Sequence, residues 1–200
     1  MARRSDHSRD EIREMALAAA ADIVEREGSR KLTARSVAGA IGYTVGTLYL
    51  VFKNLDDLVL HLNARTLDDL HEWLQARGES SAEPRRQLQG LADAYIDYAV
   101  SHTARWNLLF DSVAGDDSEL PDWYLARLSK VFGLIESALT PLVDHHGQVA
   151  IVQAARVLWA SVHGICTLKI RHRLDLAGGQ TTEQMAAMLI DNFLKGFSQT

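Results

Sequence analysis

The stretch TVGTLYLVFKNL, residues 44–55, decides how the rest of the sequence is interpreted. Small side chains come first, and two aromatic residues, Tyr49 and Phe52, follow three positions apart. Thr44 is a favourable N-cap residue, so a helix is expected to follow it and to run to about Phe52. At helical spacing Leu48 and Phe52 share one face, which we assign to the core, while Tyr49 falls outside it.

Another short helix is expected just before this one. Thr33 can N-cap the segment ARSVAGAI, and Gly42 suits the left-handed turn that ends it. Two short helices joined by the tripeptide GYT have the spacing of a helix-turn-helix. The second helix of such a motif presses its backbone into the DNA major groove, and the small side chains at residues 45–47 permit a close approach.

Helical signals continue through the whole sequence. Ser8 and Glu11 form a capping-box pattern, and the helix that they start is expected to end at Gly28. Asn54 can N-cap a long helix that runs to about Arg77. Later helices are expected around Leu88–Ala99, over 104–113, from Pro121 to Thr140, over 149–172 and from Thr181 to about Phe197. Alternating strand patterns are absent, so the predicted fold class is all-α.

Composition and charge limit the classes of protein that fit. Apolar residues make up 47% of 200, and the single cysteine, Cys166, excludes an internal disulfide bond. No apolar run approaches the length of a membrane helix, about 18 residues, so we expect a cytoplasmic protein with no membrane partner. The net charge is −5, but residues 1–55 carry +2 and the remaining residues carry −7. The basic end could face an anionic partner, whereas the overall sign disfavours non-specific coating of nucleic acid.

The segment LTARSVAGAIGYTVGTLYLVFKNLDDLV, residues 32–59, resembles the N-terminal signature of the TetR-type bacterial transcriptional repressors. The matching residues are Gly42, Gly46, Thr47, Leu48, Tyr49 and Phe52. The resemblance implies a three-helix DNA-binding domain in residues 1–54 and a helical bundle in residues 55–200 that binds a ligand and forms a dimer. One position departs from the family pattern, because Leu55 stands where the family usually has a phosphate-binding lysine.

The resemblance changes how the polar residues of this segment are interpreted. Alone, their hydroxyls would be assigned to helix capping and packing, but the family pattern favours contacts with the DNA backbone. Val45 and Leu50 could touch thymine methyl groups, and Arg35 fits a phosphate contact or a solvated charge equally well. The expected DNA-binding residues are Thr33, Arg35, Thr44, Val45, Gly46, Thr47, Tyr49, Leu50 and Lys53.

A second resemblance lies in LWASVHGICTLKI, residues 158–170, where Trp159, His163 and Gly164 match a Trp-His-Gly element of one C-terminal subgroup. Aromatic residues at helical spacing usually belong to a core. The resemblance implies, however, that this half encloses a pocket for a small effector. The expected ligand-binding residues are His102, Trp106, Phe110, Trp123, Trp159 and His163.

His163 and Cys166 lie three residues apart and, with His102, raise the question of a metal site. A hydrogen-bonded core histidine and a buried cysteine are the better interpretation, and we expect neither a metal nor a cofactor. No glycine-rich phosphate loop, nucleophile elbow or paired carboxylate motif indicates an enzyme.

The leading hypothesis is a ligand-responsive transcriptional regulator. It would bind a two-fold symmetric operator in double-stranded DNA as a homodimer, most simply as a repressor, and a small apolar or amphipathic effector would release it. Residues 149–172 and 182–197 are more apolar than one covered face requires, so they are expected to form the dimer interface. The alternative is a helical ligand-binding or metal-binding protein, or an enzyme, that does not bind DNA.

Overall fold

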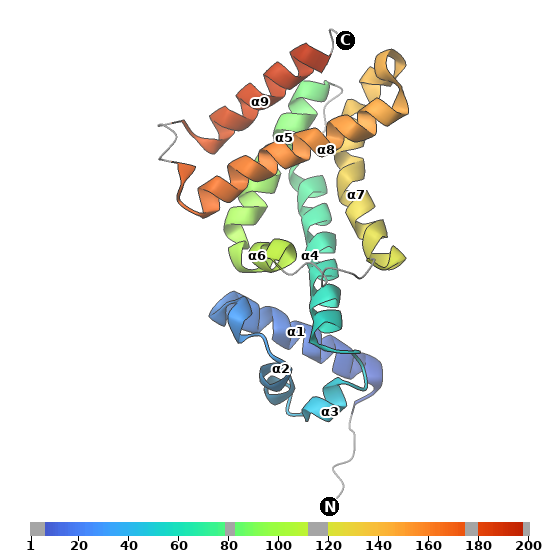
Figure 1. Ribbon diagram of the computed structural model, residues 1–200, viewed down its shortest axis with the longest axis vertical. Helices are drawn as coiled ribbons and strands as arrows, with labels where there is room; N and C mark the ends of the chain where they lie inside the picture. Colours follow the sequence, from blue (N-terminus) through green and yellow to red (C-terminus); the bar gives the residue numbers. More distant parts are fainter. Residues whose placement is uncertain (1–6, 79–82, 112–119, 175–179, 198–200) are drawn as a thin grey trace, which may run out of the picture. The chain divides into compact units, whose positions relative to one another are not determined.

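The computed structural model describes residues 7–78, 83–111, 120–174 and 180–197 (Figure 1). Within these ranges every regular element is a helix, which confirms the predicted all-α class. Packing divides the chain into two compact units, which are described separately below. The first unit comprises Met1–Thr66 and Ala104–Pro121, and the second comprises Leu67–Thr103 and Asp122–Thr200.

The first unit begins with helix α1, Arg9–Glu27, which has both halves of the predicted capping box at its start. The backbone N–H of Glu11 donates to the Ser8 hydroxyl, and the Ser8 N–H donates to the Glu11 carboxylate. The helix ends at Gly28, where a φ of 85° lies in a region that favours glycine. A single 3₁₀ turn, η1 (Ser29–Lys31), follows.

Helix α2, Ala34–Ala40, is N-capped by Thr33, and Gly42 adopts the expected left-handed conformation at φ 74°. Helix α3, Val45–Leu48, is N-capped by Thr44, as predicted. The predicted extent of this helix was wrong, because regular α-helix ends at Leu48 rather than near Phe52.

The chain continues beyond α3 as a tight turn. The N–H of Leu50 donates to the Thr47 carbonyl and that of Val51 to the Leu48 carbonyl, so these two bonds span three residues, while the N–H of Phe52 donates to the Leu48 carbonyl across four. The carbonyl of Val51 accepts a hydrogen bond from the Arg13 side chain of α1. A residue far away in sequence therefore contacts the end of this turn.

Helix α4, Leu55–Arg77, contributes residues to both units. Its start is as predicted, since the Asn54 side chain accepts from the Asp57 N–H. Leu58 and Leu62 join the core of the first unit, together with Leu108 of α6, Thr103–Asp111. The expected domain boundary after residue 54 stays a prediction, since compact units group residues by packing and not by function.

The core of the first unit is an apolar cluster drawn from its helices and from the turn after α3. The members that are at most 3% exposed are Ala16, Leu17, Ala20, Val24, Val37, Leu48, Phe52, Leu58 and Leu62. Leu48 and Phe52 are thus in the core, as their spacing predicted.

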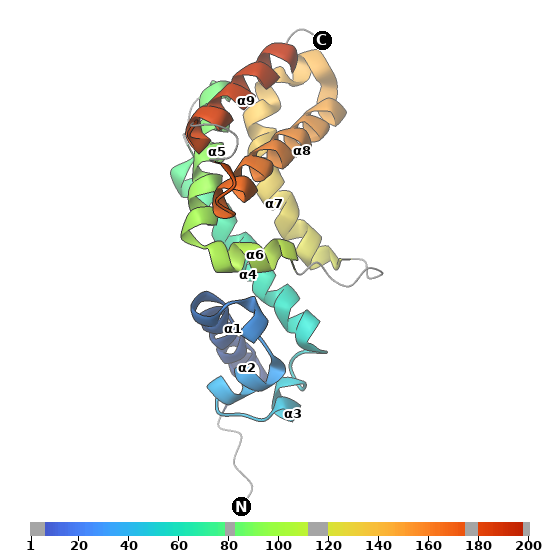
Figure 2. The ribbon, with the colours of Figure 1, turned by 60° about the vertical axis from the view of Figure 1, so that its left-hand side comes forward.

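The second unit contains the long helices α5 (Pro84–Ser101), α7 (Asp122–Leu139), α8 (Val143–Ile170) and α9 (Thr182–Phe197). Helix α5 packs against the other three, and α8 also packs against α7 and α9 (Figure 2). A 3₁₀ turn at Thr140–Leu142 joins α7 to α8.

Helix α7 begins one residue after Pro121, whereas the sequence placed Pro121 in its first turn. Helix α8 has non-helical backbone at Gly147, φ 75° and ψ 161°, so the long helical run begins after that residue, close to the expected start at 149. Within the described ranges, Gly147–Ile170 is the one helix that is long and apolar enough to cross a membrane. In its most apolar stretch of 18 residues, 39% are buried.

Candidate nucleic-acid interface and ligand cavity

The first turn of α3 presents the polar residues expected to contact DNA. The Thr44 hydroxyl accepts from the Thr47 N–H at 3.2 Å and lies 3.0 Å from the Thr47 hydroxyl. Val45 is half-buried and Gly46 is exposed between them. The local sequence, a threonine cap followed by small residues, therefore gives the N-terminus of α3 a surface from which no long side chain projects.

The turn after α3 has two distinct faces. Tyr49 is 45% exposed and Leu50 is 63% exposed, whereas Val51 and Phe52 are buried. Two adjacent side chains therefore leave the core while the next two enter it. This is the orientation that the spacing of Leu48 and Phe52 predicted for the aromatic at position 49.

The other expected DNA-binding residues lie on the exposed surface of the same unit. Thr33 caps α2, and Arg35 is exposed in the first turn of that helix. Lys53 has an exposed side chain, while its backbone N–H donates to the Asp57 carboxylate at 2.9 Å. Each residue of the predicted DNA-binding set is exposed or half-buried, and their contacts with DNA remain a prediction.

The second unit contains a narrow apolar cavity of about 40 Å³. Aliphatic side chains from α4, α5, α7, α8 and α9 form most of its wall. The lining residues are Leu74, Leu88, Leu91, Ala92, Tyr95, Val131, Ile135, Leu158, Trp159, Val162 and Ile190. Such a lining favours an apolar group in the cavity, because a buried polar group without a partner costs free energy.

A hydrogen-bonded trio lies at the aromatic side of this cavity. The indole N–H of Trp159 donates to the Tyr95 hydroxyl at 2.9 Å, and that hydroxyl lies 3.0 Å from Nδ1 of His163. Burial raises the pKa of Tyr95 well above its usual value and lowers the pKa of His163. Both shifts favour neutral groups, so one hydrogen bond joins the Tyr95 hydroxyl to a neutral His163 ring, and the ring tautomer decides which of the two donates.

Of the residues expected to bind ligand, Trp159 lines the cavity, while His163 is not in the lining but contacts the lining residue Tyr95. His102 lies elsewhere in the unit, with its ring 4.7 Å from that of Tyr98 and 5.5 Å from that of Trp73. The structure does not bring His102 to the lining of this cavity.

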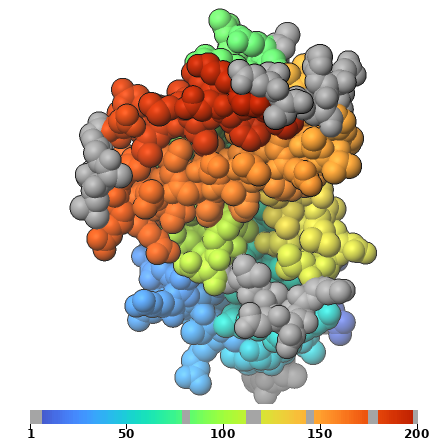
Figure 3. Space-filling model, turned by 45° about the horizontal axis from the view of Figure 1, so that its top comes forward, coloured from blue at the N-terminus to red at the C-terminus, as the bar shows by residue number. Residues whose placement is uncertain are grey.

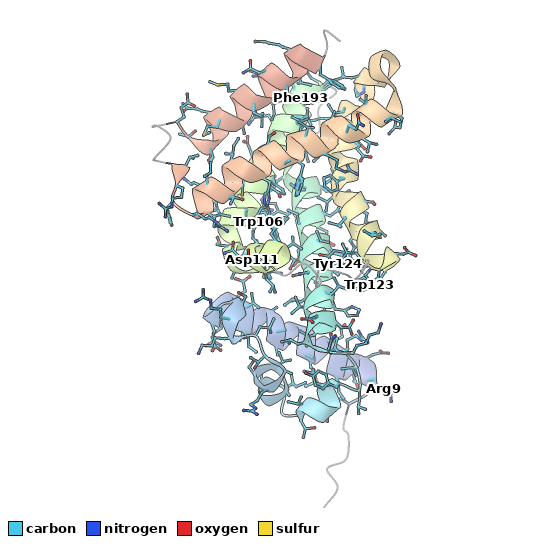
Figure 4. The ribbon with its side chains drawn as sticks, in the orientation of Figure 1. Arg9, Trp106, Asp111, Trp123, Tyr124 and Phe193 are labelled. Carbon is cyan, nitrogen blue, oxygen red and sulfur yellow. The ribbon has the colours of Figure 1, made fainter. Side chains whose placement is uncertain are left out.

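Three other expected ligand-binding aromatics also lie away from the cavity lining. Trp106, labelled in Figure 4, lies on α6. Its ring centroid is 4.7 Å from that of Phe110 on the same helix, and both residues belong to the first unit. Trp123, on α7, packs beside Arg127, whose guanidinium lies 5.7 Å from its ring centroid. A role of these residues in ligand binding stays a prediction.

Most of the lining was not predicted, because residues such as Leu88, Leu158 and Ile190 show only the helical periodicity common to all core positions. Tyr95 and Trp159 lie 64 positions apart, so no local sequence pattern predicts their hydrogen bond.

Within the described ranges, no group of three or more potential metal ligands lies together. Cys166 is buried, and burial raises the pKa of its thiol to about 12. The thiol therefore stays protonated, which disfavours metal coordination.

Helices α8 and α9 also form an apolar groove on the outer surface of the second unit. Its lining residues are Ser161, Ile165, Gln180, Met185, Met188, Leu189, Asn192 and Phe193. Val157, Leu168 and Met188 are each more than 40% exposed on these two helices. Figure 3 shows the two helices side by side on one face of the molecule.

The chain is similar in sequence to known proteins over most of its length. A sequence model of the family described as "Tetracyclin repressor-like, C-terminal domain" matches residues 88–193, more than half of the chain. An uncharacterised helix-turn-helix-type transcriptional regulator of Mycobacterium tuberculosis is 28% identical over 176 residues, which are 88% of this chain and 76% of that protein.

Solved structures with the same fold are more distant in sequence. A protein of unknown function from Rhodococcus sp. RHA1 has a TM-score of 0.73 at 21% identity, with 98% of each chain covered. The transcriptional regulator FadR of Bacillus subtilis, in complex with stearoyl-CoA, has a TM-score of 0.64 at 14% identity, with 92% of this chain and 96% of that chain covered. At these identities the likeness concerns the fold alone.

Proposed function

The chain belongs to the TetR family of transcriptional regulators, and on that premise we propose that it is a ligand-responsive repressor that binds a two-fold symmetric operator as a homodimer in the cytoplasm. The observation that carries this proposal is the two-faced segment at the end of the helix-turn-helix. Leu48 and Phe52 are buried in the core, while Tyr49 and Leu50 are exposed beside the small residues of α3. A surface of this kind can enter the DNA major groove.

Gly46 supports the same proposal. A Cβ atom added there would meet only the Thr44 hydroxyl oxygen, at 3.7 Å, which is an ordinary contact. Packing within the unit therefore does not require glycine at this exposed position. A glycine at this position does, however, let the α3 backbone come close to a partner such as DNA.

The proposed homodimer rests on α8 and α9. Only 39% of the most apolar stretch of Gly147–Ile170 is buried, so the apolar side chains that this helix leaves exposed favour a further partner in water. The second copy of the chain is the simplest cover, because helix pairs from two protomers can form a symmetric bundle. Operator symmetry and half-site spacing would then follow from the symmetry of the dimer.

The proposed effector is small and apolar or amphipathic. The aliphatic lining of the cavity in the second unit supports this class, and a charged group would lose its hydration there without compensation. A structural relative holds stearoyl-CoA, which is an amphipathic molecule of this general type. Effector binding would favour a conformation of the dimer with lower affinity for DNA.

Salt-dependent binding to a duplex from the protein's own promoter region tests the proposal. We expect specific binding that weakens as salt rises, by about 0.9 in log affinity per log salt for each phosphate contact. A scrambled duplex of the same length and composition serves as the control. Absence of binding to any promoter duplex at low salt would contradict DNA binding and favour a helical ligand-binding protein instead.

A further inference from the structure

The segment that we propose reads DNA, called the reading segment below, consists of α3 and the turn after it, residues 45–52. It is too short to keep its conformation without contacts from other elements. Helix α3 has a single turn, and isolated helices of that length do not persist in water. In the turn after it, the N–H groups of Leu50 and Val51 make bonds that span three residues and only that of Phe52 makes one that spans four. Contacts from other elements of the first unit must therefore set the direction in which Tyr49 and Leu50 leave the core.

Arg13 of α1 makes such a contact at the C-terminal side of the segment. Its Nη2 donates to the Val51 carbonyl at 2.6 Å, and its Nη1 lies 3.2 Å from Nε2 of His61 on α4. Its guanidinium also lies 4.9 Å from the centroid of the Phe52 ring. One side chain therefore connects α1, the end of the reading segment and the first part of α4.

His7, directly before α1, makes a matching contact at the N-terminal side. Its Nδ1 lies 2.7 Å from the Tyr43 hydroxyl, and the two rings meet edge to face at a centroid distance of 6.1 Å. Tyr43 immediately precedes the N-cap of α3 and packs against the core of the unit. The two contacts thus bracket the reading segment at both ends.

We propose that His7 and Arg13 are positioning residues for DNA recognition, and that together they fix the orientation of Tyr49 and Leu50. The proposal rests on the proposed function, because it assigns these two residues a role in DNA reading. Arg13 carries the larger share. It donates a charge-assisted hydrogen bond to the backbone of Val51, the residue directly after the exposed pair.

Geometry separates this role from ordinary stabilisation of the unit. Arg65 also ties α4 to α1, but its ion pair is with Glu14 of α1 and not with the reading segment. Both arginines bridge the same two helices within the same unit. Arg65→Met is therefore a matched control for Arg13→Met, with the same loss of charge and the same new side chain.

The test compares these variants by DNA affinity and by amide hydrogen exchange, well below their melting temperatures. For Arg13→Met we expect about tenfold weaker binding to the specific duplex, as the loss of one hydrogen bond to a charged group implies. Affinity for the scrambled duplex should fall much less, because phosphate contacts alone support it. Exchange of the Leu50, Val51 and Phe52 amides should become about tenfold faster.

Two further variants sharpen the result. Arg13→Lys keeps one cationic donor for the Val51 carbonyl but not the fork that also reaches His61, so it should recover part of the specific affinity. His7→Ala should weaken specific binding by about threefold, as expected for an exposed hydrogen bond. Arg65→Met should change neither the ratio of specific to scrambled affinity nor the exchange of the three amides.

Equal losses in Arg13→Met and Arg65→Met would overturn the proposal, as would unchanged exchange of the Leu50–Phe52 amides in Arg13→Met. If Arg13→Met does not fold, Arg13→Lys decides between the outcomes with the same two measurements. Failure of the proposed function is distinguishable, because wild-type protein would then bind no duplex, while amide exchange would still report whether Arg13 holds the segment.

Discussion

Both units of this chain have an apolar core, but they differ in what else fixes their helices. Short helices in the first unit are fixed by bonds between polar side chains and backbone, such as the Thr33–Ser36 box and the Arg13–Val51 contact. Long helices in the second unit pack through aliphatic surfaces and leave a cavity between them. Directional bonds suit a surface that must read DNA in one geometry, whereas an apolar core with spare volume can adapt to a ligand.

The largest expected effect concerns the exposed apolar surface of the second unit. The double variant Val157→Asp with Met188→Asp should be monomeric and lose operator binding, because dimerisation would bury carboxylates at a cost of several kcal/mol. Sedimentation at micromolar concentration measures the mass. Leu125→Asp, at an apolar residue of α7 that is 42% exposed, is the control and should remain dimeric. A monomeric wild type would contradict the interface.

The polar trio beside the cavity tests whether directional bonds also matter in the second unit. Tyr95→Phe removes the acceptor of the Trp159 N–H and the partner of His163. We expect a loss of about 1–3 kcal/mol in the free energy of unfolding, the cost of burying polar groups without their partners. Denaturant titration followed by tryptophan fluorescence measures it. Tyr124→Phe, at another buried tyrosine, should cost less, and equal losses would argue against the trio.

In the first unit, Tyr49→Ala tests the exposed face directly. Because Tyr49 is 45% exposed, the fold should survive. Operator affinity should fall by about 1–2 kcal/mol, as expected for a lost hydroxyl contact with a charged group. Circular dichroism melting and binding isotherms separate the two effects. A variant that unfolds without a separate loss of affinity would show that the ring is needed for packing.

The contrast between the units also limits what the sequence could predict. Threonine caps and Gly42 act through neighbouring residues, so the starts of α2, α3 and α4 were predictable from local pattern. The end of α3 was not, because no local signal marks the change to three-residue bonds after Leu48, and Arg13, which contacts the turn at Val51, lies 38 positions earlier. In the second unit periodicity predicted the helices but not which faces meet, so the aliphatic lining of the cavity could not be derived.

Acid pH should affect the second unit through His163. Burial lowers the pKa of His163 below its usual 6.5, so folding favours the neutral ring. The unfolded chain binds the proton more readily, and this contribution is therefore fully present above pH 6.5 and is lost as the pH falls below it. His163→Gln keeps an acceptor but does not titrate. Its melting temperature should decline less between about pH 7 and about pH 5.5. Parallel declines would exclude His163 as the cause.

The smallest expected effect concerns Leu55, the first residue of α4, where the family pattern usually has a lysine. Leu55 is half-buried, so a longer side chain can reach solvent from this position. If that position faces a phosphate, Leu55→Lys should tighten operator binding at low salt with little change in sequence preference. The slope of log affinity against log salt should steepen by about 0.9 for each protomer, or about 1.8 for a dimer.

A charge-matched control separates this contact from a general gain in positive charge. Leu125→Lys adds the same charge at an exposed apolar residue of the second unit, and its slope should stay close to that of the wild type. Affinities for specific and scrambled duplexes across a salt series measure both variants. An unchanged slope in Leu55→Lys, together with a lower melting temperature, would mean that Leu55 contributes to packing. Lys53, exposed two residues earlier, or a backbone amide would then fill the phosphate role instead.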